Sequence, residues 1–336
     1  MRRNLVIAIG LGLTIATSQP GLAMPVAQSV EAAAYGEAVD SLAGKLEASY
    51  VDPAVGKLYA AMLRANRATY LRIDDPAVLA KRLTTDLQAV HADGHLRVSI
   101  PGVGGAPGPR AARPSDGPAI QDPKWIADGV AYVRFTMFDG SPESLATLEA
   151  FMKEHADAKA IIFDARGHHG GGPDEMDVIL PYLFAQPTRL VTLDLAQSVV
   201  DALEEPPRDP AYMRHVVGPP GVYRREHWVT PNAETRLRGA KVFYLTSRAT
   251  ASAGEHLALA LQRTHRGLVV GERTAGANHF GGFEPIGAGL TAFVPVGRAF
   301  DPDTGKDWEG VGLTPDVVVP ADQALDKALE LARAGV

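Results

Sequence analysis

Residues 160–173 read AIIFDARGHHGGGP, a short apolar run followed by a turn rich in glycine. The apolar residues 160–163 are typical of a strand buried on both faces, as in a parallel sheet. The glycines after them let backbone N–H groups face a ligand without a side chain in between. The turn lacks the GxxxxGK[ST] spacing and has no lysine, which argues against nucleotide binding. It is either a flexible turn or a backbone site for negative charge, such as an oxyanion hole.

Strands and helices alternate along the chain on both sides of this stretch. Such alternation predicts an α/β core that contains parallel strand pairs. The expected strands are 130–135, 190–195, 241–245, 268–270 and 290–295, and the expected helices are 141–155, 174–184, 251–264 and 322–334.

The segment before this core is helical by its pattern. Apolar residues recur at helical spacing between about 30 and 92, and Asp75-Pro76 is a helix start signal. Asp93-Gly94 predicts a turn, after which residues 95–100 alternate as a strand does. We therefore predict a small N-terminal helical subdomain over 24–94 and an α/β domain over 95–336. Within the latter, 101–128 is expected to be a linker and 204–238 an irregular insert.

The first residues resemble an export signal. Arg2 and Arg3 precede an apolar run, and small residues follow near 21–23, so residues 1–23 are predicted to be a cleaved signal peptide. The apolar run is short for a membrane span, so stable membrane insertion is not expected after cleavage. A periplasmic or secreted protein is the resulting expectation.

Composition excludes several classes of function. The chain of 336 residues has a net charge of -6 with scattered basic residues, so nucleic acid is not an expected partner. It has no cysteine, which excludes a thiol nucleophile and iron–sulfur clusters. His91 and His95 have HxxxH spacing, but Asp93-Gly94 should break a helix between them and no HExxH motif is present. Neither a metal nor a cofactor is predicted.

Two further segments could carry chemistry. Ser252 lies in TASAGE, residues 250–255, where a helix is expected to begin. There its hydroxyl could be a nucleophile beside helical N–H groups, or it could merely cap the helix. Glu309 opens EGVGLTPD, residues 309–316, and by itself is a carboxylate beside a glycine-rich turn. A serine nucleophile would also need a base, and ten histidines are available.

Together these segments resemble the tail-specific, or C-terminal-processing, serine protease superfamily. ASAGE at 251–255 and GLVVGERTAG at 267–276 are similar to its nucleophile helix and the strand that follows. DARGHHGG at 164–171 is similar to its glycine turn, and residues 309–316 to its late motif. The helices leading to 83–87 and the segment 93–98 are similar to the branch named after interphotoreceptor retinoid-binding protein. The resemblance covers about 35–330 and implies a crotonase-like (ClpP/crotonase) α/β core.

The resemblance also implies a set of site residues. The lysine that follows the nucleophile by 25 positions in many members is replaced by Ala277, so a Ser–Lys dyad is not expected. A tricorn-core-like triad is implied instead, with Ser252 as nucleophile, His95 as base and Glu309 orienting the histidine. The oxyanion hole would use Ala253 with Gly170 or Gly171. His168 stands where the family usually has asparagine, and 101–128 is too short for a PDZ domain.

The resulting prediction is a serine endopeptidase that hydrolyses peptides or unfolded proteins in the cell envelope. Two alternatives remain at this point. One is a non-catalytic binding protein for hydrophobic ligands, which would not need Ser252. The other is an esterase that uses the same triad.

Overall fold

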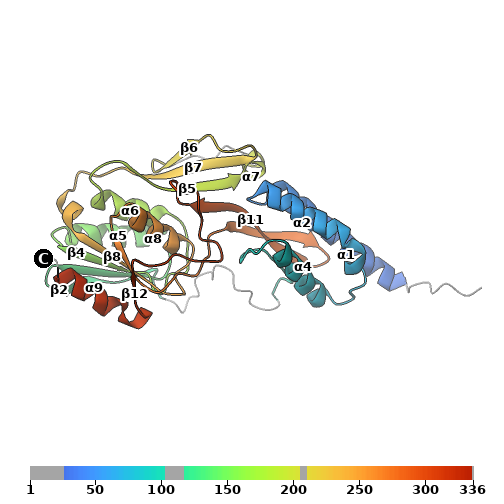
Figure 1. Cartoon of the computed structure of the whole chain (residues 1–336), viewed down its shortest axis with the longest axis horizontal. Coiled ribbons are helices and arrows are strands. Elements are labelled where there is room, and N and C mark those ends of the chain that lie inside the picture. Colours follow the sequence, from blue (N-terminus) through green and yellow to red (C-terminus); the bar gives the residue numbers. More distant parts are fainter. Residues whose placement is uncertain (1–25, 103–116, 205–209, 335–336) are drawn as a thin grey trace, which may run out of the picture.

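The computed structural model describes residues 26–102, 117–204 and 210–334, and side chains from residue 33 onward. The predicted signal peptide, residues 1–23, lies outside these ranges. No helix in the described ranges is long and apolar enough to span a membrane. Two six-stranded sheets organise the described chain, one largely parallel and one antiparallel (Figure 1).

The parallel sheet is built around the apolar strand that precedes the glycine turn. That strand, β4 (Ala160–Asp164), is buried at every position. The strand order is β12-β9-β8-β4-β3-β2, in which β2 alone is antiparallel to its neighbour. The other members are β2 (Ile120–Ala127), β3 (Val130–Phe135), β8 (Lys241–Thr246), β9 (Leu268–Gly271) and β12 (Val317–Val318). The predicted parallel α/β core is therefore confirmed.

Helices cover both faces of this sheet. On one face lie α5 (Pro142–Glu154), α6 (Asp174–Leu183) and α8 (Ala253–Arg263), packed in the largest hydrophobic cluster. On the other face lies α9 (Ala324–Arg333), after the short η3 (Ala321–Gln323), and it buries Ala324, Ala328 and Ala332 (Figure 1). Small residues at this spacing let the helix lie close to the strands.

The antiparallel sheet has the order β1-β11-β5-β7-β6, with β10 paired to β11. Its strands are β1 (Arg97–Ser99), β5 (Thr188–Ala196), β6 (Met213–Val216), β7 (Val222–Val229), β10 (Phe280–Gly287) and β11 (Leu290–Phe300). Between β5 and β6 lies the short α7 (Gln197–Asp201), and η2 (Arg236–Gly239) follows β7.

Two expectations about irregular segments were wrong. The insert 204–238 contains the β6–β7 hairpin, which extends the sheet from β5. The sequence does not indicate this hairpin because β7 is largely half-buried and contains Arg224, Arg225 and Glu226. Alternation of apolar and polar residues is therefore weak there. Likewise the linker 101–128 includes β2, whose exposed residues and bulge at Asp122, with φ of 53°, hide the strand pattern.

The N-terminal helices share a core with the antiparallel sheet. They are α1 (Val26–Ser49), α2 (Pro53–Ala65), α3 (Arg67–Tyr70) and α4 (Pro76–Val90), and Asp75 caps α4 as predicted. Their buried residues form one cluster with Ile286, Leu290, Ala292 and Val294 of the sheet. The helices thus pack on the sheet that reaches toward them in Figure 1, and β11 connects this layer to the rest of the molecule.

Candidate active site

Ser252 occupies a strained position at the start of a helix. It directly precedes α8, with φ of 52° and ψ of -117°. Residues other than glycine rarely adopt positive φ, and such strain gathers at functional sites. The first turn of α8 places backbone N–H groups beside Ser252, where they favour negative charge. Ser252 also forms a capping box with Glu255, so the structure gives it the capping role that the sequence left open, in addition to this strained conformation.

The glycine turn after β4 lies against Ser252. A methyl group on Gly170 would lie 2.8 Å from the Ser252 Cβ, and one on Gly171 would lie 1.7 Å from the Phe138 carbonyl oxygen. Both glycines have positive φ, of 112° and 129°. Only glycine fits these two positions, so the turn brings bare backbone to the serine.

His168 fixes the conformation of this turn. Its ring is fully buried, and its Nδ1 accepts a hydrogen bond of 3.0 Å from the Gly170 N–H. Burial, and secondarily the neighbouring His169, lower the pKa of His168 to about 3, so the ring is neutral with its proton on Nε2. The Gly170 amide is thus occupied. In the described chain, neither the Gly171 N–H nor the Ala253 N–H has a hydrogen-bond acceptor.

Glu255 connects the start of α8 to the loop after β9. Its carboxylate accepts hydrogen bonds from the backbone N–H of Ser252 (2.9 Å), Gly276 (2.7 Å) and Ala277 (2.8 Å). The Thr274 hydroxyl donates a fourth, of 2.6 Å. Burial raises the pKa of Glu255 although these donors favour its charged form. Ala277, where the dyad lysine would stand, contributes only its backbone.

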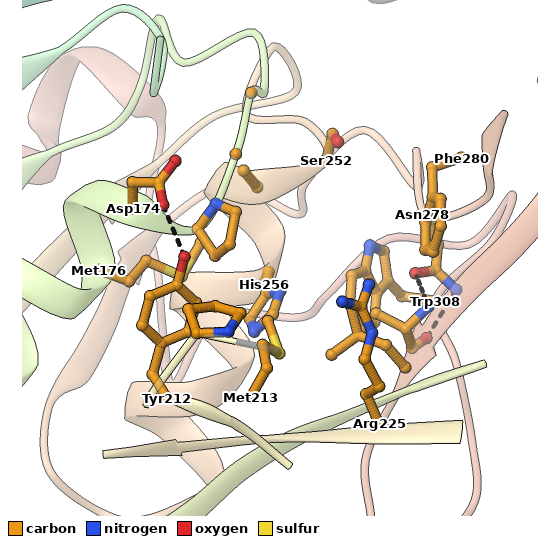
Figure 2. Close-up of a pocket in the computed structure, with 17 residues that line it drawn as sticks. Asp174, Met176, Tyr212, Met213, Arg225, Ser252, His256, Asn278, Phe280 and Trp308 are labelled. Carbon is orange, nitrogen blue, oxygen red and sulfur yellow. Dashed lines mark hydrogen bonds between the residues drawn. The ribbon is translucent and has the colours of Figure 1, made fainter. Parts of the chain in front are cut away.

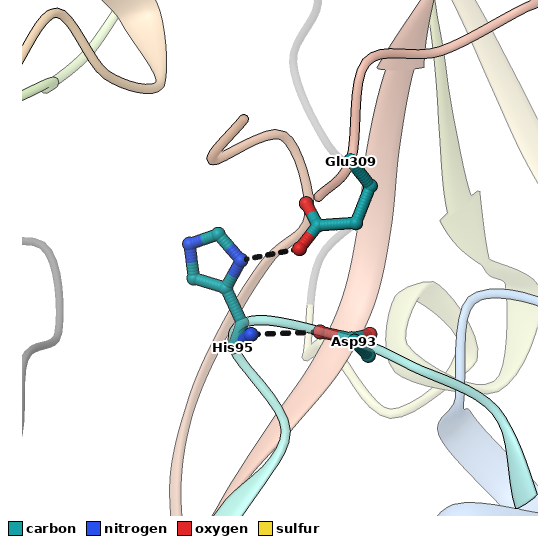
Figure 3. Close-up of side chains that lie close together, drawn as sticks. All are labelled: Asp93, His95 and Glu309. Carbon is teal, nitrogen blue, oxygen red and sulfur yellow. Dashed lines mark hydrogen bonds and ion pairs between the residues drawn. The ribbon is translucent and has the colours of Figure 1, made fainter. Parts of the chain in front are cut away.

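His95 and Glu309 meet across 214 residues of sequence. The His95 Nδ1 lies 3.3 Å from the Glu309 Oε1, and their side chains are only 8% and 6% exposed (Figure 3). Glu309 Oε2 also accepts from the backbone N–H of Asn278 and His279, each at 2.8 Å. Burial raises the pKa of Glu309, but the bond to His95 and the charge of His279 outweigh burial and lower it overall. The carboxylate is therefore ionised and directed at one ring nitrogen of His95.

The structure brings the predicted residues together in two groups. His95 and Glu309 form one, and Ser252, Ala253, Gly170 and Gly171 form the other. Within the described residues, no hydrogen bond joins Ser252 to His95. The His95 Nε2 likewise has no hydrogen-bond partner there, and it is the atom that a triad requires for the serine.

Asp93 was not predicted as a site residue, although it stands two positions before His95. Its Oδ1 accepts from the backbone N–H of His95 (2.8 Å) and Leu96 (3.1 Å). Its Oδ2 accepts from the Tyr50 hydroxyl and pairs with His279 Nδ1, both at 2.8 Å. Asp93, His95 and Glu309 offer three potential metal-ligand atoms within 4.8 Å of one another. The carboxylate oxygens of Asp93 and Glu309 all accept hydrogen bonds from the protein, which fits a hydrogen-bonded network better than a metal site.

A pocket of about 440 Å³ opens beside Ser252 (Figure 2). Gly171, Ala253 and Ser252 line it together with apolar residues, and the β6–β7 hairpin supplies Met213 and Arg225. Apolar walls come from Met176, Leu193, Phe280, Ala299 and Trp308.

The polar groups of the pocket are mostly neutral or paired. His256 bonds to His227 at 2.9 Å, and burial lowers the pKa of His256 to about 4 and that of His227 well below its usual value. Asn278 pairs with the Ala299 backbone, and Tyr212 donates to Asp174. Apart from the charged side chains of Arg225 and Asp174, the lining thus suits an uncharged, largely apolar group.

Comparison with known proteins agrees with this geometry. The profile of peptidase family S41 matches residues 129–319, more than half of the chain. The chain belongs to peptidase family S41. This confirms the resemblance to tail-specific proteases, and the S41 assignment supports a serine peptidase.

Solved structures share the S41-like fold. A photosystem II D1 C-terminal processing protease matches over 90% of this chain and 96% of its own, with 18% identity and a TM-score of 0.53. A candidate peptidase from Parabacteroides merdae matches over 88% and 96%, with 17% identity and a TM-score of 0.61. A lipoprotein from Streptococcus agalactiae matches over 95% and 100%, with 12% identity and a TM-score of 0.53. At these identities the likeness shows the fold alone.

Proposed function

We propose that the chain is an exported serine endopeptidase that cleaves peptides or unfolded proteins through Ser252, His95 and Glu309. The single observation that carries the triad is the buried pair of His95 Nδ1 and Glu309 Oε1 at 3.3 Å, made by residues far apart in sequence. A carboxylate on Nδ1 holds the neutral imidazole in the tautomer whose Nε2 can accept a proton.

The proposed reaction follows from these positions. The Ser252 Oγ attacks the peptide carbonyl carbon while its proton passes to His95 Nε2. The protonated imidazole, stabilised by Glu309, then gives that proton to the leaving amine, and the C–N bond breaks. A water molecule then gives a proton to His95 Nε2 and attacks the carbonyl carbon of the acyl-serine. The C–O bond to Ser252 breaks, His95 returns the proton to the Ser252 Oγ, and the acid is released. No step uses a metal or a cofactor.

The oxyanion hole is assigned to the backbone N–H groups of Ala253 and Gly171. The two flank Ser252 in the pocket, and neither has an acceptor among the described residues. We choose Gly171 over Gly170 because the Gly170 amide donates to His168. Two such donors stabilise the charge that develops on the carbonyl oxygen in the transition state.

The pocket defines the proposed substrate side chain. Because its one lining histidine, His256, is neutral and most of its walls are apolar, the pocket favours an uncharged apolar residue beside the scissile bond, with Arg225 and Asp174 as the charged groups of its lining. The export signal predicted from residues 1–23 supports a reaction in the periplasm or outside the cell. Peptides and unfolded proteins are the proposed partners.

Reaction with a fluorophosphonate probe tests the nucleophile. We expect the wild type and Ser198→Ala, which alters an exposed serine, to be labelled, and Ser252→Ala and His95→Ala to lose labelling. Peptide and ester turnover by the same variants then separates a peptidase from an esterase. A folded wild type that stays unlabelled and inactive would instead favour the ligand-binding alternative.

A further inference from the structure

A second buried acid–histidine pair lies behind the His95–Glu309 pair. His279 Nδ1 is 2.8 Å from Asp93 Oδ2, and the two side chains are 9% and 0% exposed. A buried ion pair of this kind is rarely kept for stability alone, because taking the charges out of water offsets much of their attraction. Its place next to the proposed triad therefore calls for a role.

The two pairs are interlocked through the backbone. Asp93 holds the backbone N–H of His95, while Glu309 holds the backbone N–H of His279. Each carboxylate thus bonds to the ring of one histidine and to the main chain of the other. Gly94, between Asp93 and His95, also donates its N–H to Glu309 at 3.1 Å. Moving either pair would disturb the other.

The charges around His279 favour its protonated form. Asp93 faces it at Nδ1, Asp307 lies 4.0 Å from Nε2, and Glu309 binds its backbone. Arg298 compensates part of the Asp307 charge at 3.0 Å, and the Tyr50 ring, a neutral phenol, lies 6.4 Å from the imidazole. Burial acts to lower the pKa of His279, but the bond to Asp93 and these acidic charges raise it overall.

We infer that His279, ion-paired with Asp93, is a positioning residue that holds Glu309 in place for the proposed peptidase reaction. The inference rests on the proposed function. Asn278 and Phe280 on either side of His279 line the pocket, whereas His279 does not. Its effect is therefore expected on proton transfer by His95 and not on substrate binding.

The charge of His279 gives the inference a specific signature. The positive ring of His279 lies against Asp93 and its charge acts on Glu309, so it compensates part of the negative charge that these two carboxylates place beside the proposed base. Asparagine at 279 retains a donor near the Nδ1 position but removes the charge. In His279→Asn this compensation is lost, and the acid limb of the rate profile should move to higher pH by roughly half a unit to one unit.

The experiment compares peptide hydrolysis between pH 5 and 9 for wild type, His279→Asn, His279→Ala and His215→Asn. His215→Asn is the matched control, because His215 is exposed on β6 outside the pocket. For His279→Asn we expect kcat to fall about 10-fold to 100-fold with KM within about twofold and the acid limb displaced upward. His279→Ala should lose more, and the control should match wild type.

The outcomes separate this inference from the proposed function. A rate profile of His279→Asn equal to wild type would overturn the inference while leaving the peptidase intact. A slower variant with an unmoved acid limb would also overturn it, since a merely structural role predicts that result. If the wild type neither hydrolyses peptide nor reacts with fluorophosphonate, the proposed function fails first. Should His279→Ala not fold, His279→Asn decides.

Discussion

At the scale of single residues, the site contains a strained backbone at Ser252 and a buried pair of side chains, His95 and Glu309. Ser252 is held at positive φ by the hydrogen bond from its N–H to Glu255, and Gly170 gives it room. Glu309 is held by three backbone donors in addition to His95. Such preorganised groups need little rearrangement when charge develops on a substrate.

Replacing Glu309 by glutamine tests the orientation of His95. The amide keeps the size of the side chain but removes the charge that stabilises the imidazolium, so we expect kcat to fall by about two to four orders of magnitude. Hydrolysis of a fluorogenic peptide measures this loss, with Glu284→Gln as an exposed carboxylate control. Wild-type activity in Glu309→Gln would refute the assigned role of Glu309.

Replacing Gly170 by alanine tests the close approach of the turn to the nucleophile. The methyl group would lie 2.8 Å from the Ser252 Cβ in a backbone region that favours glycine. We expect fluorophosphonate labelling to slow by at least about 10-fold, with destabilisation of roughly 1–3 kcal/mol. Gly239→Ala is the control, because a methyl group there meets nothing within 4 Å. Undiminished labelling of Gly170→Ala would show that the turn does not constrain Ser252.

At the scale of elements, the β6–β7 hairpin is both sheet and pocket wall. It pairs with β5 through β7 and places Met213 and Arg225 in the lining. Figure 2 shows Met213 and Tyr212 close to His256 on the side of the pocket opposite Phe280. The chain that follows α8 and the β6–β7 hairpin thus line the same pocket.

Filling the pocket from this hairpin tests its part in substrate choice. Tryptophan at Met213 would occupy part of the 440 Å³ cavity. We expect kcat/KM for peptides with a large apolar side chain at the cleaved bond to fall about 10-fold or more relative to alanine peptides. Val217→Trp is the control, since Val217 is 94% exposed. An unchanged preference in Met213→Trp would place the substrate side chain elsewhere.

At the scale of the whole molecule, Asp93 joins the helical layer to the site. It bonds to Tyr50, which follows α1, and to His279, which precedes β10. Burial acts to raise the pKa of Asp93, but His279 and Tyr50 outweigh it and lower the pKa to about 2. A carboxyl whose folded pKa is lowered stabilises the protein above its unfolded pKa and loses this contribution as pH falls through the folded value.

The predicted consequence is a pH-dependent stability. The contribution of Asp93, roughly 2 kcal/mol, should be complete above about pH 4 to 5 and disappear as pH approaches 2. Urea unfolding at pH 6 and pH 3 should therefore show a smaller pH dependence for Asp93→Asn than for wild type. Asp326→Asn, on α9 far from this network in sequence, is the matched control. Equal pH dependence in wild type and Asp93→Asn would contradict the prediction.

The parallel core could be predicted from the sequence, and so could the start of a helix at Ser252. Their signals are local: an unbroken apolar strand, glycines at its end, and small residues around Ser252 at a helix start. Local patterns survive in any fold that buries them, which is why β3, β4, β8 and α6 lie close to their expected ranges. The strands β2, β6 and β7 were missed because charged and exposed residues occupy their ladders.

Contacts between residues far apart in the sequence follow from the tertiary fold and could not be predicted from local patterns. The contact of His95 with Glu309 depends on β1 pairing with β11 and on the loop that carries Glu309 returning to it. The sequence suggested this pair only through family resemblance, and it indicated no site role for Asp93 or His279. Asp93 and His279 are 186 residues apart and form a hydrogen bond. A contact over this separation depends on the topology of the chain and leaves no local sequence pattern.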